Sequence, residues 1–360
     1  MPEPLKNIYT QDFIQTLSKE LKKGYKKFDS KGFEFSVFNE DWSELELKQR
    51  MRHIALNLKE FIPKSFHESI NIMKPAATQF GGFESMFFPD YVELYGLDDF
   101  DISIDAMEHF TKYSSSEFAV RPFIKKYPDK MMRQMSLWAE SDNYHVRRLA
   151  SEGCRPRLPW AMALPKFKKN PQPVLKILEK LKHDNEEYVR RSVANNLNDI
   201  SKDNPDLVIK KANKWLGHSA ETDWVVKHAC RSLLKAGHKD VLTLFGFSCV
   251  DHIELNKFKI DNAVAWNGEL NFSFRLISKE KRLDKLRIEY AIYFVKSNKK
   301  QSKKVFKISE GNYPEAEKEI FRSFSFKPIS TRKYYPGKHE LSIIVNGEEF
   351  RGKSFVLLEK

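Results

Sequence analysis

Cysteine is scarce in this chain of 360 residues, because only Cys154, Cys230 and Cys249 occur, at wide spacings. Three widely spaced cysteines, an odd number, exclude a disulfide framework and a cysteine-based zinc or iron–sulfur site. They fit a reducing compartment. No apolar run approaches the roughly 20 residues that span a bilayer. We therefore expect a cytoplasmic protein with no signal peptide and no membrane-spanning segment.

Several well-known catalytic motifs are also missing. The sequence has no Walker A loop, no dinucleotide-binding glycine pattern, no Gly-x-Ser-x-Gly elbow and no His-Glu-x-x-His. Its ten histidines do not cluster at the spacings of metal ligands. We therefore expect no metal and no cofactor, and nucleotide-dependent and metal-dependent enzymes become poor candidates.

Positive charge, by contrast, is abundant. There are 62 Lys and Arg against 49 Asp and Glu, which gives a formal net charge of +13. Such a balance favours an anionic partner, either nucleic acid or a membrane surface, although a merely lysine-rich protein would look similar. The segment 12–28 predicts a basic amphipathic helix, which could lie on a membrane or simply face solvent.

A repeat with a basic residue after valine runs through the middle of the chain. The four copies are spaced by about 26 to 43 residues, and they are Val120-Arg121, Val146-Arg147-Arg148, Val189-Arg190-Arg191 and Val226-Lys227. Each copy lies near the start of an expected helix, with asparagine or aspartate in the turns before two of them. Helix–turn–helix units at this period are typical of HEAT-like repeats, which stack into a curved solenoid with a concave binding surface.

The expected helix 186–200 carries two distinct stripes of side chains. Apolar residues recur at helical spacing and form a packing stripe, namely Val189, Val193, Leu197 and Ile200. Polar residues form the second stripe, namely Ser192, Asn196 and Asp199, with Asn195 beside it. Adjacent asparagines are poor helix formers, so we expect them to serve a purpose other than helix stability.

Near residue 250 the helical periodicity gives way to strict alternation. Apolar residues alternate with polar ones at 270–276, 286–292 and 341–345, and Asn346-Gly347 supplies a turn. About seven short strands in this length predict an immunoglobulin-like sandwich. The sequence therefore predicts a multidomain protein, with an all-α HEAT-like solenoid over 1–248 and an all-β immunoglobulin-like domain over 252–360. Residues 251–360 hold 23 Lys and Arg against 15 Asp and Glu, a net +8.

Three stretches resemble the AlkC-type DNA alkylation-repair glycosylases, which share their HEAT-like fold with the AlkD type. They are Glu-Phe-Ala-Val-Arg-Pro-Phe-Ile at 117–124, Ser-Glu-Gly-Cys-Arg-Pro-Arg-Leu-Pro-Trp at 151–160, and the run from Tyr188 to Asp206. The resemblance extends over about 1–250, and some members also carry a C-terminal immunoglobulin-like domain that helps grip DNA. It implies a monomeric, cofactor-free enzyme that excises cationic bases such as 3-methyladenine and 3-methylcytosine from damaged double-stranded DNA without base flipping.

The resemblance also implies the residues of the active site. A cationic base leaves as a neutral molecule, so the enzyme needs negative charge near the sugar rather than a strong acid, as carboxylates supply in glycoside hydrolysis. The expected catalytic residues are Glu152, Asp199, Glu117 and Trp160. Each has a purely structural alternative. Glu152 could form an ion pair with Arg148, and Asp199 could pair with Lys202 at the end of its helix. Glu117 could form a capping box with Ser114, and Trp160 could lie in the core.

Basic and amide side chains around these acids are expected to bind DNA. The candidates are Arg121, Arg147, Arg148, Arg155, Arg157, Arg190, Arg191, Asn195 and Asn196. Some of the paired arginines must point away from DNA, and the sequence does not say which. A non-catalytic HEAT-repeat scaffold that binds DNA or protein is the main alternative, and a membrane-surface protein is the next.

Overall fold

The computed structural model describes residues 3–329 and 332–359, and the chain divides into two compact units, 1–229 and 230–360. In the described part of the chain, every helix is too short or too polar to cross a membrane. The first unit is helical, with three short 3₁₀ segments at Leu5–Ile8, Glu40–Ser43 and Phe83–Met86. Its α-helices are α1 (Gln11–Gly24), α2 (Ser30–Val37), α3 (Leu47–Phe61), α4 (Phe66–Ala77), α5 (Phe87–Tyr95), α6 (Phe100–Thr111), α7 (Val120–Lys126), α8 (Pro128–Trp138), α9 (Tyr144–Glu152), α10 (Pro165–Lys169), α11 (Gln172–Leu181), α12 (Glu187–Ile200), α13 (Pro205–Trp215) and α14 (Ala220–Ala229).

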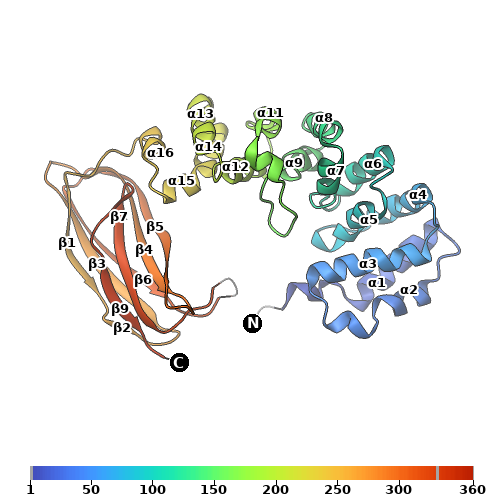
Figure 1. Ribbon diagram of the computed structural model, residues 1–360, viewed down its shortest axis with the longest axis horizontal. Helices are drawn as coiled ribbons and strands as arrows, with labels where there is room; N and C mark the ends of the chain where they lie inside the picture. Colours follow the sequence, from blue (N-terminus) through green and yellow to red (C-terminus); the bar gives the residue numbers. More distant parts are fainter. Residues whose placement is uncertain (1–2, 330–331, 360) are drawn as a thin grey trace. The chain divides into compact units, whose positions relative to one another are not determined.

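From α8 onward the helices form the two layers of a helical repeat (Figure 1). In one layer α12 packs between α9 and α14, and α8, α11 and α13 lie in the other. The outer helices are anchored by Trp138 and Trp215, which are buried and whose indole N–H groups donate to Glu108 and Glu179. The predicted inner helix 186–200 is therefore confirmed as α12, and its four apolar positions are all buried.

The repeat also shows in how the turn before each inner helix is fixed. The Nη1 of Arg147 donates to the carbonyls of residues 141 and 142, at 3.0 and 2.9 Å. The Nη1 of Arg190 donates to residues 184 and 185, at 2.6 and 2.9 Å. The sequence offset is the same in both repeats. The first arginine of each Val-Arg-Arg sequence therefore satisfies carbonyl groups of the preceding turn, which would otherwise lack partners.

The second unit begins with α15 (Arg231–Lys235) and α16 (Lys239–Leu244) and continues as strands. Three strands form one sheet in the order β1-β3-β6, and the other sheet runs β2-β9-β7-β4-β5 with β8 paired to β7. The strands are β1 (Ile253–Ile260), β2 (Ala263–Val264), β3 (Glu269–Ser278), β4 (Asp284–Val295), β5 (Gln301–Tyr313), β6 (Glu317–Ser325), β7 (Gly337–Val345), β8 (Glu348–Glu349) and β9 (Lys353–Leu357). The secondary structure thus changes between Leu244 and Ile253, while the compact units divide earlier, at Ala229; the boundary expected at 248–252 stays a prediction.

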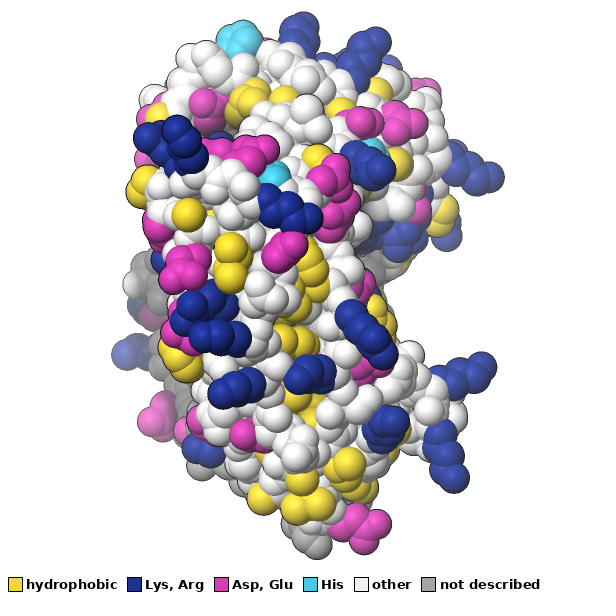
Figure 2. Space-filling view, turned by 90° about the vertical axis from the view of Figure 1, so that its left-hand side faces the viewer, with side chains coloured by type: hydrophobic (Ala, Val, Ile, Leu, Met, Phe, Trp, Pro, Cys, Tyr) yellow, Lys and Arg dark blue, Asp and Glu magenta, His cyan; other side chains and the backbone are white. Residues whose placement is uncertain are grey.

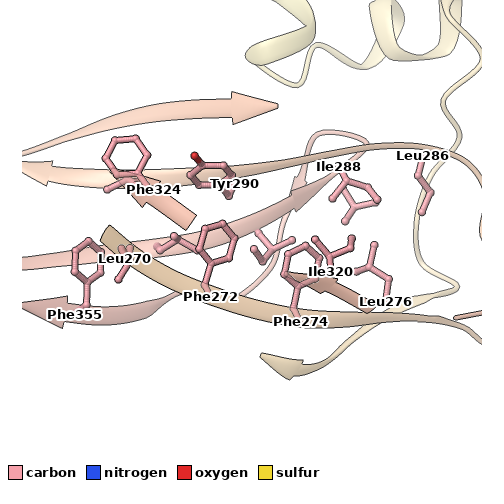
Figure 3. Close-up of a cluster of buried hydrophobic side chains, with 14 of the residues drawn as sticks. Leu270, Phe272, Phe274, Leu276, Leu286, Ile288, Tyr290, Ile320, Phe324 and Phe355 are labelled. Carbon is pink, nitrogen blue, oxygen red and sulfur yellow. The ribbon is translucent and has the colours of Figure 1, made fainter. Parts of the chain in front are cut away.

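Apolar side chains from both sheets share one core (Figure 3). The alternating residues of the sequence supply it, because Phe272 and Phe274 of β3 and Ile288 of β4 are all nearly or fully buried. This arrangement confirms the predicted immunoglobulin-like sandwich. On the side of the molecule drawn in Figure 2, many Lys and Arg side chains project, with Asp and Glu between them.

Candidate active site

Glu152 is the last residue of α9, and its carboxylate points at α12 instead of solvent. Its Oε2 accepts from the hydroxyl of Ser192 at 2.6 Å, and its Oε1 accepts from Nη1 of Arg155 at 2.6 Å. Arg148, one turn earlier on α9, lies 3.5 Å from Oε1. Burial alone would raise the pKa of Glu152, but Arg148, Arg155 and Ser192 outweigh it, so the pKa lies below its ordinary value. Glu152 is therefore a buried group that stays ionised.

Asp199 lies near the end of α12 and shares a cation with Glu152. Its Oδ2 accepts from Nε of Arg155 at 2.9 Å, and Lys202 lies 3.2 Å from its Oδ1. All three groups of the Glu152–Arg155–Asp199 chain are buried. The sequence motifs 151–160 and 188–206 thus meet through one guanidinium, which had been expected to contact DNA.

Glu117 lies in the segment before α7 and forms an ion pair with Arg148, whose Nη1 also donates to Ser115 at 2.8 Å. The Ser115 hydroxyl in turn donates to Glu117 at 2.7 Å. The expected capping box with Ser114 does not form, because α7 begins only at Val120 and the Ser114 hydroxyl donates to the Gly82 carbonyl.

A surface pocket of about 310 Å³ opens at this ion pair. Its charged lining side chains are Glu117 and Arg148. Four aromatic rings line it as well, those of Phe83, Tyr113, His145 and Tyr188. The Arg148 guanidinium stands 5.0 Å from the centre of the Tyr188 ring. Neither Glu152 nor Asp199 lines the pocket, so the three acids differ in access: Glu117 faces the opening, and the other two lie behind it.

Trp160 projects from the loop between α9 and α10, which leaves the row of helices in Figure 1. Its side chain is 63% exposed, which excludes the alternative of a core tryptophan. The indole meets the edge of Phe83 with ring centres 5.9 Å apart, and so it borders the pocket. Its backbone has φ = 61°, a left-handed conformation that is unfavourable for a bulky residue, and Lys48 donates to its carbonyl at 2.5 Å.

Arg121 lies elsewhere than expected. Its side chain is 1% exposed, Nε donates to the Met162 carbonyl at 2.7 Å, and Nη1 donates to the Gly153 carbonyl at 2.9 Å. It therefore joins the two ends of the Trp160 loop, and the expectation that it contacts phosphate is wrong for this structure. Burial lowers the pKa of Arg121 to about 10, which still leaves the side chain charged near neutral pH.

The other candidate DNA contacts fall into two groups. Arg147, Arg155 and Asn196 are tied to the protein itself: Arg147 binds Asp184 through two hydrogen bonds, Arg155 joins the two buried acids, and the amide of Asn196 donates to the Ser151 carbonyl. Arg190 binds its own turn, as described above. These side chains were expected to bind DNA, but each already donates to a partner within the fold.

More accessible positions belong to the second group. Arg157 pairs with Asp203 and is 37% exposed, and Arg191 pairs with Glu187 and is 60% exposed. Asn195 is half-buried, with its Oδ1 3.3 Å from His228 Nε2. Exposed ion pairs are weak and can exchange partners, so these arginines remain available to an external anion.

Cys154 lies between Glu152 and Arg155 in the sequence, but its thiol is unreactive. It is fully buried, and burial raises the pKa of its thiol to about 12. A thiol in that range is not a nucleophile near neutral pH.

Sequence reasoning missed Phe83, His145, Tyr188 and Ser192 as neighbours of the acids. One signal was available, because His145 and Tyr188 each stand directly before a Val-Arg-Arg sequence and so occupy equivalent places in two repeats. Phe83 gave no such signal, since it reaches the pocket from a distant 3₁₀ segment.

Comparison with known proteins places this geometry in a family. A family model described as "DNA alkylation repair enzyme" matches residues 105–233, and one described as "Uncharacterised protein YhaZ, C-terminal Ig-like domain" matches 254–359. The uncharacterized protein YhaZ of Bacillus subtilis is 49% identical over 346 residues, 96% of each chain. The structure of the Pseudomonas fluorescens alkylpurine DNA glycosylase AlkC, bound to DNA containing an abasic site analog, has 36% identity and a TM-score of 0.95, covering 99% of this chain and all of that one. The chain therefore belongs to the AlkC-type family of DNA alkylation-repair glycosylases and carries the C-terminal immunoglobulin-like domain.

Proposed function

We propose that this protein hydrolyses the N-glycosidic bond of cationic N-alkylated bases, of the 3-methyladenine and 3-methylcytosine type, in double-stranded DNA. It acts as a monomer in the cytoplasm, needs no cofactor, and leaves an abasic site without flipping the base. The observation that carries the proposal is the pocket lined by aromatic rings and a carboxylate, with the Trp160 indole against Phe83, one of those rings. Each of these groups attracts positive charge.

Their chemistry fits a bond that is already weak. The alkylated base leaves as a neutral molecule, while the deoxyribose becomes cationic in the transition state. Glu117 is the carboxylate that faces the pocket, so we assign it the place beside the developing cation. An aromatic face adds about 0.5–2 kcal/mol of attraction for a cation, which is the role we give to Trp160.

Glu152 and Asp199 act from behind the pocket. Both are buried, and together they hold Arg155 in place, while Glu152 also lies beside Arg148. Their negative charge offsets two guanidinium groups that would otherwise repel a cationic sugar or base. In this assignment Asp199 also orients the attacking water once DNA has bound and the site has rearranged.

We assign binding of the DNA phosphate backbone to the accessible basic residues. Arg157 and Arg191 on the helical unit are the first candidates, and residues 251–360, with their net charge of +8, add others. Binding through several phosphate contacts weakens steeply as salt is raised.

Base release from methylated duplex DNA tests the proposal. We expect wild type to release 3-methyladenine or 3-methylcytosine, and Glu117→Gln to slow single-turnover release by about 10²–10³-fold with little change in DNA affinity. Glu140→Gln is the matched control, because Glu140 is 63% exposed and pairs with Lys180. No release by wild type, with retained DNA binding, would leave the non-catalytic scaffold as the better description.

A further inference from the structure

An apolar groove of about 420 Å³ lies beside the Trp160 loop, on the helical unit. It is formed by the end of α7, by Pro128 at the start of α8 and by residues 162–167. Ile124, Leu164 and Phe167 make a buried floor, and Met162 is 46% exposed at its edge. An apolar hollow open to water is a feature that binding partners commonly cover.

The charged side chains that line this groove are all basic. Lys125 and Lys166 are exposed in its lining, and none of the nine lining residues is acidic. Within the ranges 3–329 and 332–359 neither lysine has an ion-pair partner, whereas the nearby Lys126 and Lys130 pair with Asp98 and Asp101. The groove thus combines an apolar floor with two uncompensated cations.

We propose that this groove docks an acidic segment of a partner protein, with apolar side chains on the floor and carboxylates against Lys125 and Lys166. A protein segment fits better than DNA, because a phosphate backbone offers nothing to bury on Ile124, Leu164 and Phe167. An amphipathic helix lays its apolar face into such a groove and presents its charges to the rim.

The docking surface is joined to the proposed active site by backbone contacts. Met162 lines the groove, and its carbonyl accepts the 2.7 Å hydrogen bond from Arg121. Arg121 also holds Gly153 at the other end of the Trp160 loop. An occupant therefore packs on the segment that fixes this loop, and a partner docked there stands next to the site of base release.

A labelled peptide tests the surface directly on the full-length protein. The probe is a short fluorescein-labelled peptide with leucine and phenylalanine on one helical face and glutamate on the other. Two control peptides replace glutamate by lysine, or the apolar residues by serine. We expect fluorescence anisotropy to detect binding of the first peptide and neither control.

Charge reversal then locates the binding. Lys125→Glu with Lys166→Glu weakens peptide affinity by about tenfold or more, and Met162→Asp weakens it too. The matched control is Lys19→Glu with Lys22→Glu, which makes the same charge change on exposed positions of α1 and leaves affinity unchanged. The proposal would be overturned if the peptide did not bind, or if the control substitutions weakened binding equally. It would also be overturned if undamaged duplex DNA displaced the peptide and this displacement required Lys125 and Lys166.

Discussion

The carboxylates of Glu152 and Asp199, which come from two successive repeats, accept hydrogen bonds from the same guanidinium, that of Arg155, at 2.6 and 2.9 Å. All three groups are buried, so none can turn to water if the others are lost. The arrangement makes Arg155 a structural cation at the centre of the proposed site. A buried charge without its partner is costly, so the loss of Arg155 should destabilise the helical unit.

Replacing Arg155 by Met removes the cation that two buried carboxylates share, and leaves Glu152 with Arg148 and Asp199 with Lys202. We expect the free energy of unfolding of the helical unit to fall by about 3–5 kcal/mol, as measured by urea denaturation. Arg157→Met is the control, since its pair with Asp203 is partly exposed and is worth at most about 1 kcal/mol. Adding Glu152→Gln and Asp199→Asn to Arg155→Met should restore part of the loss, and equal costs for both arginines would contradict this account.

Trp160→Gly separates stability from activity. Glycine accepts the positive φ of this position without strain, so we expect the free energy of unfolding to stay unchanged or to rise by up to about 1 kcal/mol. Base release should slow by about twofold to thirtyfold, which corresponds to losing about 0.5–2 kcal/mol of a cation–aromatic contact. Trp160→Phe keeps an aromatic face and should retain most of the activity. A glycine variant that is fully active would remove Trp160 from the site.

The pH dependence of base release should report on His145. Burial, and then the neighbouring Arg148, lower the pKa of His145, so the pocket holds a neutral imidazole near pH 7. Acidification below the ordinary histidine range adds a cation to a pocket that has to accept a positively charged base, so the rate should fall there. In His145→Asn this part of the acid limb should disappear. An acid limb that is identical in the variant would show that His145 is not the group responsible.

The stability of the strand-rich unit should also depend on pH, through His339. This residue is fully buried, its Nδ1 accepts from the Val295 N–H at 3.2 Å, and its Nε2 lies 3.0 Å from the Tyr335 carbonyl. Burial lowers the pKa of His339, although the hydrogen bond to Tyr335 opposes the shift. The unfolded chain therefore binds the proton more readily, and stability should be lost as pH falls through about 6.5. Thermal melts across this range should give melting temperatures for wild type and His339→Gln that differ at neutral pH and become similar in acid.

Much of the fold was accessible from periodicity alone. The helix 186–200 and the alternating strands around 270–276 and 286–292 were predicted correctly, because each buries one face whose spacing the sequence records. Periodicity could not predict which partners the arginine side chains bind. Arg147 and Arg148 are neighbours in sequence, yet one binds Asp184 and the other Glu117, and both partners come from distant segments. A helical pattern places a side chain on a face and does not reveal which carboxylate another repeat brings to it.

The sequence also could not rank the three acids by access. Glu117 had a plausible structural role at a helix start, but it lines the pocket, while Glu152 and Asp199 are enclosed by their cations. Access depends on how the segment 114–119, the 3₁₀ segment at Phe83 and the Trp160 loop pack together. None of these has a periodic pattern, so only the three-dimensional arrangement defines the opening.

The shared contact of Arg147 and Arg190 with the turns before their own helices has a consequence for folding kinetics. Contacts five and six residues apart form without closing long loops, so each repeat can order itself early. The sandwich depends instead on distant partners, since β2 pairs with β9 through Ala263 and Val356. In pulsed hydrogen exchange during refolding, amides of α9 and α12 should gain protection before those of β9, and the reverse order would show that nucleation begins in the strands.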